Sequence, residues 1–334
     1  MATAKAQEAG KSRGLGKLIL GFLVSIALIF AVTRYANLSQ VAQRFDDFQW
    51  GYLPLVLVAV IGYYLLKGLR WHLFLRAVGI SLPLGVSLLV YLSGQWFAFS
   101  PAGEFVKAYL LRRYGVDFGQ ASTTIVMQVM VDFLSLALLG SLTLIWYPAL
   151  SYVVLPFSGV LFLGIGLLCQ EQLWEKLERW QRPSSLLRRL GISWEGLLRD
   201  SCSLTRGRQI LIGLALGIPT ALLGSATLLL VAVGYAAPVN LAQTTFVYSL
   251  SQLLGAMSML PHGLGAVEGS SLALFDYVGM EDASLAAAVI ALFRLASLVW
   301  GVGVGGLALL AVPFLRVRPK ITLSEGGGVC ARPD

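Results

Sequence analysis

Charged side chains are scarce in this sequence. They account for 13% of its 334 residues, about half the share found in soluble domains. The shortage excludes a protein with a fully solvated surface. Several apolar runs of roughly 18 to 27 residues carry few or no charges, and each is long enough to cross a ~30 Å hydrocarbon core. The sequence therefore predicts an all-α polytopic membrane protein.

Cysteine and histidine are also rare. The three cysteines, Cys169, Cys202 and Cys330, show no CxxC spacing, which argues against a disulfide framework or a zinc site and favours ordinary thiols. His72 and His262 are the two histidines, and the sequence has no HExxH motif. It also lacks a P-loop, a Ser-His-Asp arrangement and a dinucleotide fingerprint. We therefore expect no metal, no cofactor, and transport rather than enzymatic chemistry.

The net charge of +8 does not indicate nucleic-acid binding. Basic residues flank the apolar runs and collect in particular loops, as expected for topology signals and for contacts with anionic lipid headgroups. Lys and Arg are missing from residues 209–293, where the turn region is acidic. The positive-inside rule, applied to the short loops, places both termini in the cytoplasm of a multi-pass plasma (inner) membrane protein.

One transmembrane domain, at residues 16–315, accounts for almost the whole chain. A basic cytoplasmic segment, 1–15, precedes it, and the glycine-containing tail, 316–334, is expected to be flexible and cytoplasmic. A charged cytoplasmic loop at 170–208 interrupts the domain. Six segments are predicted to cross the membrane completely: 16–34, 51–69, 119–147, 150–169, 209–234 and 284–313.

Two further apolar segments, 83–100 and 241–260, do not fit this topology as plain spans. If the first crossed the membrane, Lys107, Arg112 and Arg113 would lie outside the cell. A re-entrant helical hairpin, which enters the membrane and returns, keeps them cytoplasmic. The same reasoning predicts that the second segment forms a hairpin entering from the opposite face. Eight plain spans with a local violation of the rule are the alternative.

The two segments open similar units, at residues 83–147 and 241–313. Each continues with a Pro/Gly break and a glutamate, Pro101-Ala-Gly-Glu104 in the first unit and Pro261-His-Gly-Leu-Gly-Ala-Val-Glu268 in the second. A glycine follows each glutamate after eleven residues, and a long helix then begins. Three spans, 119–147, 150–169 and 209–234, lie between the two broken segments, so the second segment starts from the opposite side and its unit is inverted. Inverted repeats with broken helices are typical of transporters whose substrate site lies at the repeat interface.

The breaks and the buried charges form the predicted substrate path. Non-helical backbone at membrane depth requires a cavity or protein cover, and a lone charge in a span costs about 2.5–3.5 kcal/mol. We expect Asp132 and Arg294 to face one cavity, as a pair or with separate partners; a purely structural salt bridge is the alternative. Glu104 and Glu268 either contact a cationic group or a proton, or stabilise a helix N-terminus. The other path residues are Pro101, Gly103, Pro261, His262, Gly263 and Gly265.

A second set of candidate residues is basic. Lys67, Arg70, Lys107, Arg112 and Arg113 stand near the predicted cytoplasmic boundary. Positive-inside anchoring is one explanation of this cluster. The sharper hypothesis is that these residues bind the phosphate of a lipid headgroup entering from that leaflet, because arginine binds phosphate in a bidentate manner.

Four stretches of the chain carry a family resemblance. They are LLKGLRWHLFLRAVG, PAGEFVKAYLLRRYG, the long helix with Asp132, and LPHGLGAVEGSSLALFDYVG with the later LFRL. Together they resemble the lysylphosphatidylglycerol synthetase transmembrane-region family over roughly residues 15–315, and this resemblance implies lipid transfer between leaflets. We expect a stand-alone domain without the synthetase half. Family members usually have a Glu-Arg pair before the buried aspartate, where this chain has Gln128-Val129.

The hypothesis that follows is an integral membrane lipid translocase, which moves a phospholipid or lipid-linked headgroup through the cavity between the hairpins. The partners considered are a membrane lipid, a lipid-modifying enzyme and a second copy of the chain as a homo-oligomer. Two alternatives stay open. One is an accessory membrane protein that binds or regulates a lipid-modifying enzyme without transport. The other is a membrane-embedded lipid-phosphate transferase with Glu104 or Glu268 as its acid.

Overall fold

The described part of the protein is almost entirely helical. The computed structural model describes residues 38–97, 103–168, 170, 176, 194–205, 207–258, 260–312 and 320–321. Four helical stretches are long and apolar enough to cross a membrane: Trp50–Ala77, Phe118–Thr143, Gly207–Gly234 and Ala283–Ala311. With the shorter apolar helices, they confirm the prediction of an all-α polytopic membrane protein.

The long stretches coincide with four of the six predicted spans. They consist of η2 (Trp50–Tyr52) with α3 (Leu53–Ala77), of α6 (Phe118–Thr143), of α11 (Gly207–Gly234), and of α14 (Ala283–Arg294) with η5 (Leu295–Val299) and α15 (Trp300–Ala311). The predicted span at 150–169 is the helix α7 (Ser151–Leu168), which follows η3 (Pro148–Leu150). The predicted span at 16–34 lies outside the described residues.

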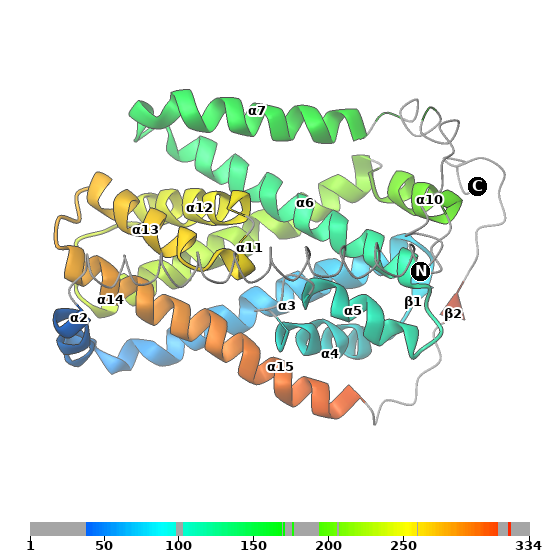
Figure 1. Ribbon diagram of the computed structural model, residues 1–334, viewed down its shortest axis with the longest axis horizontal. Helices are drawn as coiled ribbons and strands as arrows, with labels where there is room; N and C mark the ends of the chain where they lie inside the picture. Colours follow the sequence, from blue (N-terminus) through cyan, green and yellow to red (C-terminus); the bar gives the residue numbers. More distant parts are fainter. Residues whose placement is uncertain are drawn as a thin grey trace, which may run out of the picture.

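Two pairs of shorter helices lie among the long ones. α4 (Leu84–Gln95) contacts α5 (Gly103–Arg112), and α12 (Leu241–Met257) contacts α13 (Ala266–Tyr277) after the turn η4 (Pro261–Gly263). At 1.5 Å per residue, each of these helices is at most about 26 Å long, less than the ~30 Å hydrocarbon core. Figure 1 shows the first pair in the half of the molecule that carries β1 (Ile80–Ser81), and the second pair in the half that carries α2 (Leu38–Arg44).

α5 and α13 end in the same way, and a long helix starts after each. In both, the amide of a glycine donates to the carbonyl three residues earlier, and the next amide donates to the carbonyl five residues earlier. These glycines are Gly115 and Gly279, with φ of 84° and 98°, a conformation that glycine adopts without steric cost. Asp117 and Asp282 then accept backbone hydrogen bonds at the start of α6 and α14. The predicted glycine turns are confirmed.

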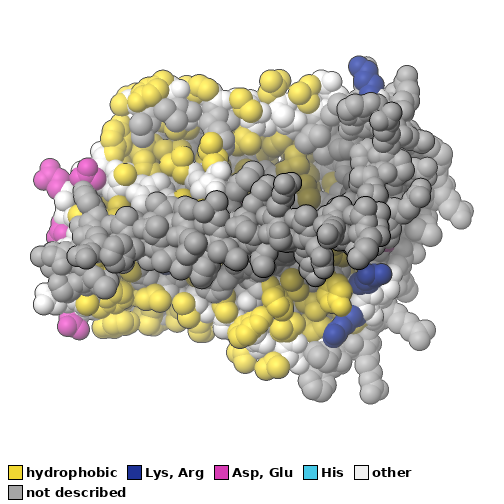
Figure 2. All heavy atoms as spheres, viewed as in Figure 1, with side chains coloured by type: hydrophobic (Ala, Val, Ile, Leu, Met, Phe, Trp, Pro, Cys, Tyr) yellow, Lys and Arg dark blue, Asp and Glu magenta, His cyan; other side chains and the backbone are white. Residues whose placement is uncertain are grey.

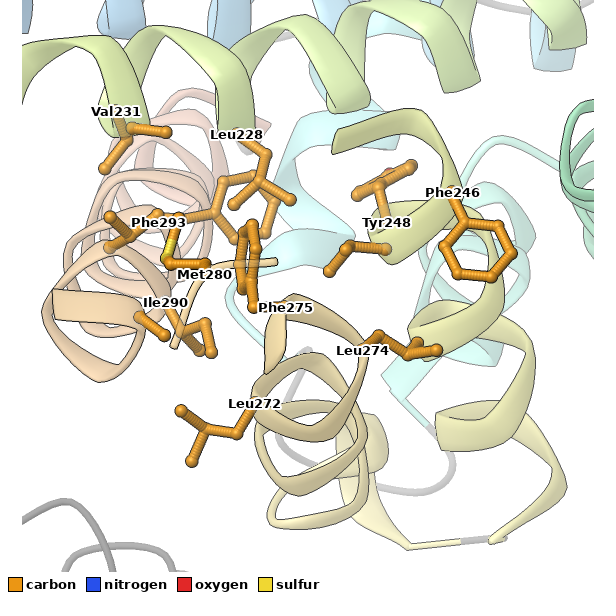
Figure 3. Close-up of a cluster of buried hydrophobic side chains, with 14 of the residues drawn as sticks. Leu228, Val231, Phe246, Tyr248, Leu272, Leu274, Phe275, Met280, Ile290 and Phe293 are labelled. Carbon is orange, nitrogen blue, oxygen red and sulfur yellow. The ribbon is translucent and has the colours of Figure 1, made fainter. Parts of the chain in front are cut away.

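Apolar side chains fill two cores. One lies among α6, α11, α12, α13 and α14, and Figure 3 shows the side chains of α11, α12, α13 and α14 converging, with Phe275 among them. The other joins α3, α4, α5 and α6 around the buried Trp71 and Phe74. Small residues allow the close helix packing that a membrane interior favours. A Cβ atom on Gly305 of α15, for example, would lie 2.5 Å from the amide nitrogen of Trp96, directly after α4.

The charged surface is divided between the two ends of the molecule. Figure 2 shows acidic side chains at one end and Lys and Arg side chains at the other. The exposed acids include Asp46, Asp47, Asp276, Glu281 and Asp282, and the exposed basic residues include Arg76, Arg112 and Arg113. Since the long helices run from one end to the other (Figure 1), an apolar belt separates an acidic from a basic end.

Two details differ from the sequence predictions. Cys202, on α10 (Trp194–Thr205), is disulfide-bonded, so the prediction of three ordinary thiols is wrong. Part of the predicted flexible tail forms β2 (Lys320–Ile321), which pairs antiparallel with β1. The tail is thus hydrogen-bonded at this point to the connection between α3 and α4. Most of the predicted loop at 170–208 lies outside the described residues.

Asp282 allows a pH test of the turn before α14. Its Oδ1 accepts hydrogen bonds from the hydroxyl and amide of Ser284, and its Oδ2 lies 2.5 Å from Nη2 of Arg44. Chiefly the Ser284 hydrogen bond holds the pKa of Asp282 below its usual value. A lowered folded-state pKa stabilises the fold above the unfolded pKa of about 3.9, and this stabilisation is lost as the pH falls through the folded-state pKa. Asp282→Asn should therefore lower the Tm at about pH 6 but not below the folded-state pKa.

The measurement is thermal unfolding of the purified proteins in detergent across this pH range. Glu281→Gln is the matched control, because it removes the same charge from the adjacent exposed position, and it should leave the Tm nearly unchanged. A Tm deficit of Asp282→Asn that stays constant as the pH falls would contradict the proposed role of the carboxylate.

Candidate functional site

A cavity of about 480 Å³ lies between the two helix pairs and the long helices. Its wall includes residues of α3, α4, α5, α6, α11, α12, η4, α13, α14 and η5. This volume falls within the range of small-ligand sites. The wall combines aromatic and aliphatic side chains with several polar and charged ones, among them Tyr63, Lys67, Gln95, Glu104, Gln128, Asp132, Tyr248, His262 and Arg294.

Asp132 binds two cations from α3. Lys67 and Arg70 are three residues apart, so they project from the same side of that helix toward α6. Nζ of Lys67 lies 2.9 Å from Oδ2 of Asp132, and Nη2 of Arg70 donates to Oδ1. Arg70 is fully buried. It has room because α11 carries Gly217 beside it: a Cβ atom there would lie 2.9 Å from Nη1 of Arg70.

A second ion pair joins Glu104 and Lys107 within α5. Oε2 of Glu104 lies 2.5 Å from Nζ of Lys107. Lys107 is buried and its ammonium also lies 4.1 Å from the centre of the Tyr91 ring, a distance suited to a cation–π contact. The Glu104 side chain is 48% exposed and lines the cavity. The first helix pair therefore presents a carboxylate to the cavity and keeps its counter-charge behind it.

A third ion pair joins Glu268 of α13 to Arg294 of α14. Oε1 of Glu268 lies 2.6 Å from Nε of Arg294, and Oε2 accepts a 2.6 Å hydrogen bond from the amide of Gly265. Glu268 thus caps the N-terminus of α13 and also neutralises an arginine on the cavity wall. Both hypotheses for this residue, helix stabilisation and contact with a cationic group, are consistent with its geometry.

Regular α-helix is interrupted before α13, which carries Glu268, and after α14, which carries Arg294. His262 lines the cavity with φ of 54°, a left-handed conformation that costs a non-glycine residue about 1–2 kcal/mol. After Arg294, η5 forms a π-helical turn. In this turn the carbonyl of Ser297 accepts a 2.8 Å hydrogen bond from the hydroxyl of Tyr64, and both residues line the cavity. Strained residues and π-helical turns often mark functional sites.

The structure brings most predicted path residues together. Glu104, Asp132, His262, Gly263 and Arg294 line the cavity directly. Behind this wall, Glu268 and Gly265 are joined by their hydrogen bond, and Gly103 begins α5. Pro261 begins η4, whereas Pro101 lies outside the described residues.

The structure shows how the candidate charged residues are arranged. Asp132 and Arg294 share the cavity but do not pair with each other; each has separate partners, one of the arrangements considered above. The five basic residues are divided between the exposed end of α5 and the ion pairs. Arg112 and Arg113 are exposed at the end of α5, whereas Lys67, Arg70 and Lys107 are engaged in the ion pairs.

The sequence hypotheses missed several uncharged polar residues on the cavity wall. Tyr63, Gln95, Gln128, Tyr248 and Ser297 were not among the candidates. Two of these, Gln95 and Gln128, carried a usable signal, because an amide side chain inside a strongly apolar segment requires a polar neighbour. Within the described residues, no group of three or more His, Cys, Asp or Glu side chains is placed to hold a metal ion.

Asp132→Asn should destabilise the protein strongly. The substitution leaves Lys67 and Arg70 without a counter-charge, and breaking such a pair costs about 3 kcal/mol or more. Replacing the whole cluster, in the triple variant Asp132→Leu/Lys67→Met/Arg70→Met, should recover much of the loss because no unpaired charge is left. Thermal unfolding in detergent and expression level in membranes measure both effects. An Asp132→Asn variant as stable as the wild type would contradict the ion-pair assignment.

The sequence is similar to known proteins over most of the chain. The family model described as "Lysylphosphatidylglycerol synthase TM region" matches residues 18–306. Two UPF0104 membrane proteins of Methanothermobacter thermautotrophicus are similar to this chain. One is 24% identical over 284 residues, covering 78% of this chain and 83% of that protein. The other is 23% identical over 335 residues, covering 91% and 96%. The chain is thus an integral multi-pass membrane protein that belongs to the lysylphosphatidylglycerol synthase TM region family.

Proposed function

We propose that this protein is a lipid translocase, which moves a phospholipid or lipid-linked headgroup between leaflets while the acyl chains stay in the bilayer. The cavity between the helix pairs carries this proposal. A polar headgroup crossing ~30 Å of hydrocarbon needs polar partners along its way. Here such partners line the cavity, and they include Lys67, Glu104, Asp132 and Arg294. Membership of a family named for a lipid synthase supports a lipid as the substrate.

The two helix pairs support this proposal as re-entrant hairpins of an inverted repeat. All four helices are shorter than the hydrocarbon core, and the pairs lie in opposite halves of the molecule (Figure 1). α5 and α13 each have a glutamate in the first turn, Glu104 and Glu268, and the same glycine turn at the end. In the proposed orientation, the basic end of the molecule faces the cytoplasm.

The ion pairs suggest how the cavity admits a headgroup. Each charge on the wall has a protein partner when the cavity is empty of substrate, which avoids the cost of an isolated charge in a membrane. A charged headgroup takes the place of a protein partner beside one of these side chains, so its entry leaves few charges without a counter-charge. The Glu268–Arg294 pair joins two helices, and exchange at this pair would loosen α13 from α14 and open the cavity toward the other face.

Lipid movement in proteoliposomes tests the proposal. The full chain is reconstituted with a fluorescent phospholipid, and dithionite reports the fraction exposed on the outer leaflet over time. Wild-type protein should accelerate exchange between leaflets. Glu268→Gln should slow this exchange about tenfold, because the amide still accepts the Gly265 hydrogen bond but no longer pairs with the charge of Arg294.

Arg76→Gln is the matched control, since this exposed arginine lies in the last turn of α3 outside the cavity wall, and it should transport at the wild-type rate. Wild-type rates equal to those of empty vesicles for several headgroups would reject transport and favour a non-transporting accessory role. If Glu268→Gln lowers the Tm as well as the transport rate, the Glu268–Arg294 ion pair has a structural role.

The proposed topology has a separate test. Single cysteines at positions 112 and 276, in a variant without the native cysteines, should be labelled from opposite sides of the membrane, because Arg112 ends α5 and Asp276 lies near the end of α13. Accessibility to a membrane-impermeant maleimide in intact cells and in inverted vesicles provides the measurement. Labelling of both positions from the same side would refute hairpins that enter from opposite faces.

A further inference from the structure

Two side chains that line the cavity, Gln95 and Arg294, each have a buried nitrogen that lacks a hydrogen-bond acceptor within the described part of the chain. Nε2 of Gln95 and Nη2 of Arg294 are buried and have no hydrogen-bond partner among the described residues, although both side chains line the cavity. Gln95 is 7% exposed. An unpaired buried donor costs about 1–3 kcal/mol, so both groups favour a ligand that offers acceptor oxygens.

The charges around the cavity do not balance. Four cations, Lys67, Arg70, Lys107 and Arg294, face three carboxylates in the three ion-pair clusters of the described residues. His262 adds little at neutral pH, because the ordinary pKa of histidine is about 6.5. One positive charge is therefore in excess, and it belongs to the cluster in which Asp132 holds both Lys67 and Arg70. A single negative charge on a ligand would neutralise it.

The carboxylates, in contrast, are almost fully occupied. Both oxygens of Asp132 bind cations, and the oxygens of Glu268 bind Arg294 and the amide of Gly265. Glu104 is paired with Lys107 through Oε2. An ammonium group in the cavity would therefore compete with a protein cation for a carboxylate that is already neutralised.

We propose that the cavity selects a lipid headgroup with one negative charge and no amine, that is, a phosphodiester monoanion whose remaining groups are hydroxyls. This inference deepens the proposed lipid transport and rests on it. When the Gln95 and Arg294 side chains turn toward the cavity, the phosphodiester oxygens accept their hydrogen bonds, and the phosphate charge neutralises the excess positive charge beside Asp132. A headgroup hydroxyl donates to Oε1 of Glu104, which the Lys107 pair leaves open. A zwitterionic or aminoacylated headgroup brings an ammonium, whereas each of the three carboxylates is already neutralised by a protein cation.

Binding of three short-chain lipids to the detergent-purified full chain tests this selectivity. Dioctanoyl phosphatidylglycerol, phosphatidylethanolamine and lysyl-phosphatidylglycerol share the phosphodiester but carry zero, one and two ammonium groups. Phosphatidylglycerol should bind about tenfold more tightly than the other two, since one charge-assisted interaction is worth roughly that factor. Equal affinities, or tighter binding of either amine-bearing lipid, would overturn the inference.

Substitutions assign the selectivity to the cavity. Lys67→Met removes the excess charge while Arg70 still pairs with Asp132. The affinity for phosphatidylglycerol should then be about equal to that for the other two lipids. Gln95→Leu should lower the affinity for all three lipids by a similar factor, because each of them contains the phosphodiester. Arg76→Gln, at an exposed arginine outside the cavity, should retain the tenfold preference; if it loses that preference as Lys67→Met does, the selectivity is not local to the cavity and the inference fails.

The outcomes separate this inference from the proposed function. Lipid movement in vesicles without the binding preference would reject the inference and keep the translocase. A tenfold binding preference in a protein that does not accelerate lipid movement would keep the anionic-headgroup site and reject transport.

Discussion

The cost of placing charge inside a membrane is the constraint on which this structure depends. A single ionised side chain at the bilayer centre costs several kcal/mol unless it has a partner or water, yet seven ionised side chains lie around one cavity here. They are tolerated because they form three clusters, each of which joins opposite charges at short distance. Small residues beside the clusters matter as much as the charges: a Cβ atom on Gly94 would overlap the buried stem of Lys107, and one on Gly217 would crowd Arg70.

The same constraint explains why broken helices surround the site. A helix that begins at membrane depth exposes unpaired amides, which need acceptors in a medium without free water. Glu268 meets this need at α13 with one oxygen and holds Arg294 with the other. One side chain thus stabilises both the helix end and the cation beside the cavity. The strained His262 then fits as a consequence of breaking a helix at this depth.

Hydropathy and local motifs predicted the long helices, the glycine turns, the family and several cavity residues. They did not predict the ion-pair partners, because spacing along a helix shows which side chains share a face but not which helix packs opposite. Asp132 pairs with α3 rather than with Arg294 for this reason. Arg70 was misplaced by a boundary error: the predicted span stops at residue 69, but α3 continues to Ala77. The arginine therefore lies about two turns inside the helix, whereas Arg76, in the last turn, is exposed.

One continuous helical stretch connects the two helix pairs. α14 carries Arg294, which binds Glu268 of the second pair, and α15 packs closely against the first pair, where Gly305 meets the backbone beside Trp96. The π-helical turn η5 lies between these two contacts and contributes Ser297 to the cavity. A shift of either pair therefore reaches the other through a single helix, and a π-helical turn is one of the features at which helices bend. In the proposed translocase, alternating exposure of the cavity would require such a link, since opening one helix pair would have to be coupled to closing the other.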